Sequence, residues 1–260
     1  MARRNCSLWF SVSASFVCAP LRQADRMQPQ PKSKIAVLGG TGKEGSGLAL
    51  RWAHAGHRVV IGSRSRDRAN ETAVAINTHI GAERAEGAEN LAAAASGEIV
   101  VLAVPYAAQL STLTEVRLAL VGKILVDVTV PLVPPQVGRV QLPEGGSAVM
   151  LAQKMLGEGV RVVSAFQNVS AEHLKALDHA IDCDVLVCGD DRDARDQVIA
   201  LARDASMRAF HAGPLANSVV AEALTSVLIA INRQYKIKHS GIVITGLPTE
   251  LPNAQPSRTT

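Results

Sequence analysis

Short apolar runs rich in valine and isoleucine alternate with longer segments of helical periodicity from Lys34 onward. The runs are mostly continuous, which is typical of parallel strands covered on both faces. The predicted strands are Ile35–Leu38, Val59–Ile61, Ile99–Ala103, Ile124–Val126, Arg161–Ala165 and Val185–Val187. The predicted helices are Gly47–Ala55, Arg66–Ile80, Ala107–Ala119, Leu151–Gly157, Arg192–Ala205 and Ala216–Arg233. We therefore predict a Rossmann-type α/β fold, with a doubly wound, mostly parallel sheet and a small C-terminal helical part.

Proline and glycine punctuate this pattern and divide the chain. The stretch Val128–Ser147 is rich in both and predicts an irregular loop at the carboxyl end of the sheet, where ligands of this fold class bind. Two interpretations of Ala216–Arg233 stay open, a buried packing helix and an oligomer interface. We expect four parts. They are an extension at 1–33, a nucleotide-binding domain at 34–210, a helical segment at 211–247 and a flexible tail at 248–260.

Composition excludes several classes of protein. Of the 260 residues, 47% are hydrophobic, which argues against a disordered or low-complexity chain. The first 34 residues contain six basic side chains and a single acidic one, Asp25, and therefore carry +5. Since the whole chain carries +4, the remaining residues carry −1. Aromatic residues make up 3%, too few to predict a base-stacking surface. We expect no nucleic-acid partner.

The first 34 residues have two interpretations. Arg3 and Arg4 precede an apolar segment broken by serines, which resembles an export signal, whereas an unstructured extension or upstream sequence before Met27 is the favoured interpretation. No stretch reaches the roughly 18–20 apolar residues of a spanning helix, so no membrane partner is expected. Cys183 and Cys188 are separated by four residues, unlike zinc or redox pairs, and predict core thiols in a reducing, cytoplasmic compartment.

A glycine-rich turn follows the first predicted strand. Gly40, Gly42 and Gly45 form G-x-G-x-x-G between that strand and a helix rich in alanine and leucine, the context in which the pattern predicts dinucleotide binding. Gly40 would allow the tight turn, Gly42 the approach of a pyrophosphate, and Gly45 close packing of helix and strand. Free amides and the helix dipole favour phosphate at this helix end.

The second strand ends in Ser63-Arg64, where an NAD site usually has an acidic residue. A hydroxyl and guanidinium groups bind a 2′-phosphate that a carboxylate would repel, so the sequence predicts NADP(H) rather than NAD. We favour Arg68 as a further phosphate ligand; for Arg66, a ligand and a solvated first helical turn are both open. Tyr106, after the third strand, fits a ring contact or a half-buried surface position equally well.

Longer motifs identify a family. They are Gly39–Arg51, Gly62–Arg64, Val104–Tyr106, Asp127–Pro134, Val163–Phe166, Val187–Asp191 and Ala212–Ser218. Through them the chain resembles the F420-dependent NADP oxidoreductases, also called NADPH-dependent F420 reductases, from about residue 34 to residue 235. The resemblance implies a cytoplasmic, usually dimeric Rossmann enzyme that transfers a hydride between nicotinamide C4 of NADP(H) and C5 of the deazaflavin ring of coenzyme F420.

The resemblance also implies two sets of contacts. The cofactor-binding residues are Gly40, Thr41, Gly42, Lys43, Glu44, Gly45, Ser63, Arg64, Arg68, Val104, Pro105 and Ala165. The deazaflavin contacts are Tyr106, Gln167, Asn168, Val169, Ala171 and Leu215. Family members often carry a histidine where this chain has Gln167, and an amide hydrogen-bonds without titrating near neutral pH.

Hydride transfer between two rings requires orientation more than a protein nucleophile. The sequence offers no Ser-His-Asp set, metal cluster or evident carboxylate pair, so neither a catalytic residue nor a metal site is predicted. The scattered histidines are interpreted as structural or solvated, and Asp190-Asp191 as a helix cap. Two alternatives stay open: an NADP-dependent reductase of a flavin, metal chelate or small imine, and an NADP-binding sensor without catalysis.

Overall fold

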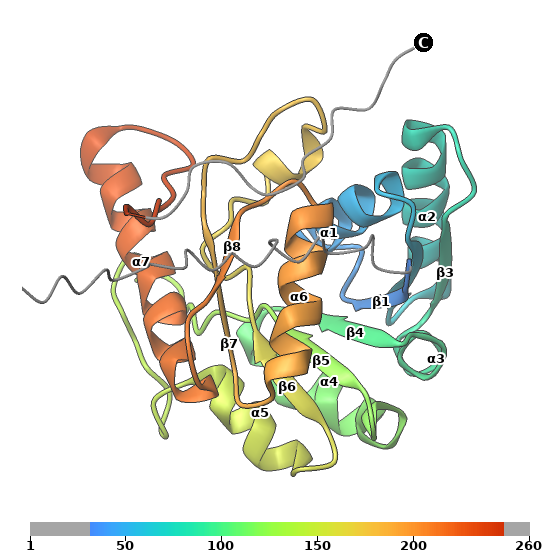
Figure 1. The fold of residues 1–260 in the computed structure, drawn as a ribbon, viewed down its shortest axis with the longest axis horizontal. Helices are drawn as coiled ribbons and strands as arrows, with labels where there is room; N and C mark the ends of the chain where they lie inside the picture. Colours follow the sequence, from blue (N-terminus) through green and yellow to red (C-terminus); the bar gives the residue numbers. More distant parts are fainter. Residues whose placement is uncertain (1–31, 247–260) are drawn as a thin grey trace, which may run out of the picture. The chain divides into compact units, whose positions relative to one another are not determined.

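The computed structural model describes residues 32–246, so the expected tail at 248–260 and most of the expected extension lie outside the described residues. Within residues 32–246, eight strands form one sheet in the order β3-β2-β1-β4-β5-β6-β7-β8 (Figure 1). The strands are β1 Lys34–Leu38, β2 Arg58–Ser63, β3 Ala85–Glu89, β4 Ile99–Leu102, β5 Ile124–Asp127, β6 Arg161–Ser164, β7 Val185–Gly189 and β8 Ala209–His211. All neighbouring pairs are parallel except β6 and β7. The predicted doubly wound, mostly parallel sheet is confirmed.

Helices cover both faces of the sheet, which explains why the strand sequences are continuously apolar. They are α1 Lys43–His54, α2 Arg66–Ile80, α3 Asn90–Ser96, α4 Gln109–Val116, α5 Ala148–Leu156, α6 Arg192–Asp204 and α7 Ser218–Tyr235. One hydrophobic core lies between the sheet and α1, α2 and α6, and a second lies between the sheet and α3, α4 and α5. The C-terminal helix α7 contacts α5 and β7, away from α2 and β3 (Figure 1).

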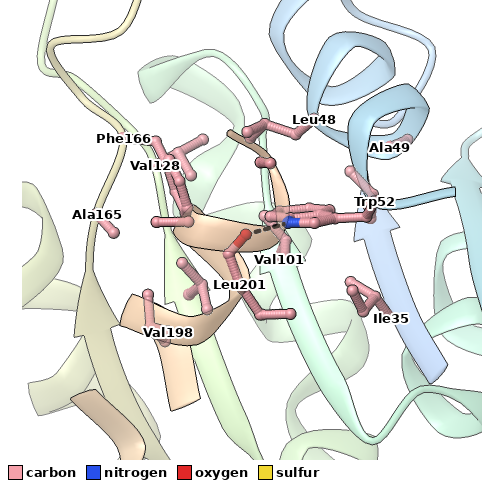
Figure 2. Packing of buried hydrophobic residues seen from close by; sticks show 14 of the residues in the cluster. Ile35, Leu48, Ala49, Trp52, Val101, Val128, Ala165, Phe166, Val198 and Leu201 are labelled. Atoms are coloured by element: carbon pink, nitrogen blue, oxygen red, sulfur yellow. Dashed lines mark hydrogen bonds between the residues drawn. The ribbon is translucent and has the colours of Figure 1, made fainter. Parts of the chain in front are cut away.

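The first core is organised around Trp52 of α1 (Figure 2). Its indole is fully buried, and its ring meets Phe166 edge to face, with centroids 5.9 Å apart. The indole Nε1 donates a 2.9 Å hydrogen bond to the carbonyl of Leu201 in α6. The large apolar ring is thus buried without leaving its N–H unpaired. The same hydrogen bond fixes α1 against α6, and α1 is the helix that begins at the glycine-rich turn.

Local sequence determines several boundaries. Helix α2 spans the predicted residues because Ser65 accepts a hydrogen bond from the amide of Arg68 at its start, while Gly81 adopts a left-handed conformation, with φ 67°, at its end. At α6, the side chain of Asp191 accepts a 2.7 Å hydrogen bond from the amide of Ala194, confirming the predicted cap. Val128–Ser147 contains neither helix nor strand, as predicted.

Several elements differ from the prediction. The edge strands β3 and β8, and helix α3, are not among the predicted elements, because β3 has the sequence AEGAE, with no apolar run, and β8 has three residues. The predicted helix Ala107–Ala119 is divided into a 3-10 turn at Tyr106–Ala108, α4, and a second 3-10 turn at Arg117–Leu120. Helix α1 begins four residues before its predicted start.

Candidate functional site

The glycine-rich turn lies where the strand order reverses, between β1 and β4, which is the ligand-binding position of this fold class. Gly39 has a φ of 75°, and a Cβ on it would lie 2.5 Å from the carbonyl oxygen of Ala103 after β4. A Cβ on Gly45 would lie 2.7 Å from the oxygen of Gly39. Only glycine fits both positions, because the turn is wedged between the two strand ends and α1. Gly42 stays exposed, which leaves the first turn of α1 open to a ligand.

A cavity of about 560 Å³ extends from this turn across the carboxyl ends of β1, β2 and β4. It brings together seven of the predicted cofactor residues, which are Thr41, Gly42, Ser63, Arg64, Arg68, Val104 and Pro105. Its remaining lining residues are Gly39, Ser65, Asn90, Ala103, Ala108, Ser111, Thr112 and Glu115. Residues far apart in the sequence therefore form one elongated site.

The β2 end of the cavity is suited to an anion. Ser63 is buried, whereas Arg64 and Arg68 are exposed, and no ion pair within residues 32–246 engages either guanidinium. Both arginines lie at the start of α2, where the helix dipole adds positive potential. Arg66 does not line the cavity. Two free guanidinium groups beside a hydroxyl can bind a phosphate through charge-assisted hydrogen bonds.

Lys43 and Glu44 lie at the start of α1 and do not line this cavity. The Lys43 ammonium pairs with Glu172 across 3.0 Å. The Glu44 side chain is half-buried, and its Oε1 is enclosed without a hydrogen-bond partner among the described residues. Burial raises the pKa of Glu44 to about 8. The raised pKa favours the neutral form of this carboxyl beside the phosphate-binding turn.

The segment after β6 presents two amides with unpaired acceptors. Phe166 adopts a left-handed conformation, with φ 73°, and sends the chain away from the sheet. Gln167 donates from Nε2 to the carbonyl of Asp127 at 2.8 Å, and Asn168 donates from Nδ2 to the carbonyl of Asp184 at 2.8 Å. The Oε1 of Gln167 and the Oδ1 of Asn168 are buried and have no partner within residues 32–246. Such acceptors suit a ligand that presents N–H or O–H groups.

The other predicted ring contacts come from separate parts of the chain. Val169 and Leu215 are buried, and Tyr106 and Ala171 are half-buried. The amide of Leu215 donates a 3.0 Å hydrogen bond to Asp190, which gives this aspartate a positioning function that the sequence did not indicate. None of these side chains lines the 560 Å³ cavity described above.

Ala165 lies within the first core, completely buried next to Phe166 (Figure 2). It does not line the cavity, so its side chain supports the chain turn at Phe166 and makes no contact with the cavity volume.

Two buried carboxylates lie outside the predicted set: Glu222 connects the C-terminal helix to α5, and Asp127 connects β5 to Gln109 of α4, which also donates to the carbonyl of Ala148. Glu222 of α7 accepts hydrogen bonds from the amides of Ala148 and Val149 at 2.8 and 3.2 Å, which places it at the N-terminus of α5. Asp127 accepts from Gln109 at 2.6 Å. Burial raises the pKa of both carboxyls. Sequence alone gave no signal for this network, because its members come from four separate elements.

His57, Cys183 and Cys188 have structural roles. His57 is buried, its Nε2 lies 2.7 Å from Asp204, and its Nδ1 accepts from the amide of Ser33. Cys183 and Cys188 are buried free thiols, and burial raises the pKa of both. Within residues 32–246 no cluster of three or more histidine, cysteine or acidic side chains is arranged to hold a metal ion.

Asn90, at the start of α3, is the cavity residue that sequence reasoning missed and that has an unpaired polar atom. The residue is buried, and its Oδ1 has no partner among the described residues. The preceding strand β3 has no hydrophobic signature, so nothing in the sequence indicated that this residue reaches the end of β2.

Comparisons with known proteins show which family this chain resembles. The family described as "NADP oxidoreductase coenzyme F420-dependent" matches residues 34–131. The F420-dependent NADP reductase of Methanocaldococcus jannaschii is 42% identical over 222 residues, covering 82% of this chain and 99% of the relative. The enzyme of the same name from Methanothermobacter thermautotrophicus is 41% identical, covering 84% and 97%. A solved structure of a putative F420-dependent NADP reductase from Arthrobacter sp. FB24 has a TM-score of 0.67 and 26% identity, covering 82% of this chain and 99% of that chain. This chain therefore belongs to the family of F420-dependent NADP reductases.

Proposed function

We propose that this protein transfers a hydride between C4 of the nicotinamide of NADP(H) and C5 of the deazaflavin ring of coenzyme F420. In one direction, NADPH, oxidised F420 and a proton give NADP⁺ and reduced F420; the reverse reaction uses the same site. Near-complete coverage of two F420-dependent NADP reductases, at 41–42% identity, is the observation that carries this proposal. The alternative reductase activities and the sensor function have no comparable support.

The cavity fits NADP(H) at both of its phosphate groups. The exposed turn at Gly42 opens the start of α1, whose first-turn amides have no partner within the helix and would face the pyrophosphate. Ser63, Arg64 and Arg68 supply one hydroxyl and two guanidinium groups for the 2′-phosphate, and β2 ends without a carboxylate. Val104 and Pro105, at the carboxyl end of β4, would flank the nicotinamide half.

The segment Gln167–Ala171 is proposed to hold the deazaflavin, with Tyr106 and Leu215 beside it. The unpaired acceptors of Gln167 and Asn168 support this assignment, because an amide oxygen complements the imide N–H of a deazaflavin. Gln167 is held at two points: its side-chain Nε2 donates to the backbone carbonyl of Asp127, and its backbone carbonyl accepts a 2.7 Å hydrogen bond from the hydroxyl of Thr225. The protein would orient the two rings and exclude water, while the rings supply the chemistry.

The direct test mixes purified protein with NADPH and oxidised F420 and follows the visible absorbance of the deazaflavin. We expect this absorbance to fall in step with oxidation of NADPH. Parallel reactions with a flavin, a ferric chelate and a cyclic imine are expected to oxidise NADPH far more slowly. Binding of NADPH without reduction of F420 at any pH would contradict the proposal.

Two further properties complete the proposal, a cytoplasmic location and a homodimer. Buried free thiols at Cys183 and Cys188 are consistent with a reducing compartment. Contrary to the expectation from the sequence, the segment Leu215–Tyr235 is long and apolar enough to span a membrane by length and composition alone, and 33% of its apolar 18-residue window is buried. Its exposed apolar side chains include Val220 and Tyr235, and we propose that they pack against a second copy of the chain. Sedimentation equilibrium with a Val220→Asp variant tests this: the wild type should be dimeric and the variant monomeric.

A further inference from the structure

The fold does not use the acceptor of Asn90. Asn90 is the first residue of α3 and follows the N-cap residue Glu89, so it does not hold the position at which an asparagine usually caps a helix. The residue Asn90 is 4% exposed, and its Oδ1 is buried without a partner within residues 32–246. A buried, unpaired acceptor destabilises a folded protein, and such groups in a cavity wall point to a ligand that completes the hydrogen bond.

The position of Asn90 identifies the part of the ligand that it meets. Strands β2 and β3 pair so that Ser63 lies opposite Glu89, and Asn90 follows immediately at the same edge of the sheet. A Cβ on Gly62 would lie 3.1 Å from the Asn90 Oδ1, so the amide rests against the last residues of β2. It lines the cavity together with Ser63 and Arg64, at the end that suits a 2′-phosphate.

A ribose that carries a 2′-phosphate still has a free 3′-hydroxyl that must donate a hydrogen bond. In NAD sites a carboxylate at the end of β2 accepts from the ribose, but that charge would repel a 2′-phosphate. An amide oxygen is a neutral acceptor. We propose that Asn90 is a specificity-determining residue that accepts a hydrogen bond from the 3′-hydroxyl of the adenosine ribose of NADP(H). This inference rests on the proposed function, because it takes NADP(H) as the cofactor.

Two substitutions distinguish the loss of the hydrogen-bond acceptor from the addition of a negative charge. Asn90→Ala removes the acceptor, so the dissociation constants of NADPH and NADH should both rise, by about fivefold to tenfold, because both ligands have the 3′-hydroxyl. Asn90→Asp keeps an acceptor of the same shape and adds a negative charge. NADH binding should then stay within about twofold, while NADPH binding weakens by about tenfold or more. Titration of NADPH fluorescence, with NADH in a parallel series, measures both.

Asn70→Asp is the matched control. Asn70 lies exposed on α2 and outside the cavity lining, so the same added charge should leave the NADPH-to-NADH preference unchanged. Equal weakening of both cofactors by Asn90→Asp, or no change with Asn90→Ala at an unchanged melting temperature, would overturn the inference. If the wild type itself shows no preference for NADPH, the proposed function fails first, so the two failures are distinguishable.

Discussion

The half-buried carboxyl of Glu44 predicts a stability that falls as the pH rises. Its Oε1 is enclosed without a partner, and burial raises the pKa of Glu44 to about 8. The adjacent Lys43 is engaged by Glu172 and gives no evident compensation. Between the usual glutamate pKa and about 8, the folded state keeps a proton that the unfolded chain releases. Unfolding then becomes easier with each pH unit in this window, by at most about 1.4 kcal/mol.

Replacement by glutamine removes this dependence while keeping the shape of the side chain. Because Glu44 is only half-buried, solvent relieves part of the full linkage, and we expect Glu44→Gln to gain about 2–3 kcal/mol over the wild type at about pH 8.5. At about pH 4, below the usual glutamate pKa, the two proteins should be nearly equal, because the carboxyl is then protonated in the native state and in most of the unfolded population. Urea unfolding followed by the fluorescence of the buried Trp52 measures the difference.

A matched comparison isolates the effect. Asp127 and Glu222 also have raised pKa values through burial, but both remain in the two proteins and cancel in the difference. Glu172→Gln removes an exposed carboxyl whose pKa is lowered, chiefly by its hydrogen bond to Lys43, so this variant should show no alkaline gain. A difference between wild type and Glu44→Gln that is the same at every pH would refute the reasoning.

Three further substitutions test other parts of the account. Arg64→Asp should weaken NADPH far more than NADH in binding titrations, whereas equal losses would reject the assignment of the 2′-phosphate end. Arg51→Met should destabilise the protein by about 3 kcal/mol or more in urea unfolding, because the buried guanidinium donates to five backbone carbonyls and the variant removes all of these hydrogen bonds. Gly47→Ala should cost about 1–3 kcal/mol, because its Cβ would lie 2.5 Å from that of Leu174; Leu174→Ala in the same chain should recover part of the loss, and no recovery would contradict this packing.

The sequence predicted the central strands and the phosphate-binding end because both have strong local signals. The apolar runs of β1, β4 and β5 are buried on both faces, and Ser65 and Gly81 delimit α2 by their own backbone chemistry. The three-residue strand β8 and the polar strand β3 are different, since pairing with a neighbouring strand, rather than apolar sequence, holds them at the sheet edges.

The parts of the site that sequence missed depend on tertiary contacts. Asn90 reaches the cavity only because β3 pairs with β2, and Glu222 reaches the N-terminus of α5 from a helix about seventy residues further along the chain. A periodic pattern records which face of an element is buried, but it does not record which distant residue that face meets. Hydrogen-bond partners of this kind follow from the assembled sheet alone.

The central claim is hydride transfer between NADP(H) and coenzyme F420, and isotope transfer tests it most directly. NADPH deuterated at the nicotinamide C4 on the transferred face is incubated with the protein and oxidised F420, and the reduced F420 is examined by mass spectrometry and NMR. The account predicts one deuterium at C5 of the deazaflavin for each NADPH consumed, with none exchanged to water. Reduced F420 without deuterium from either face of C4, or NADPH bound and F420 left oxidised, would contradict it.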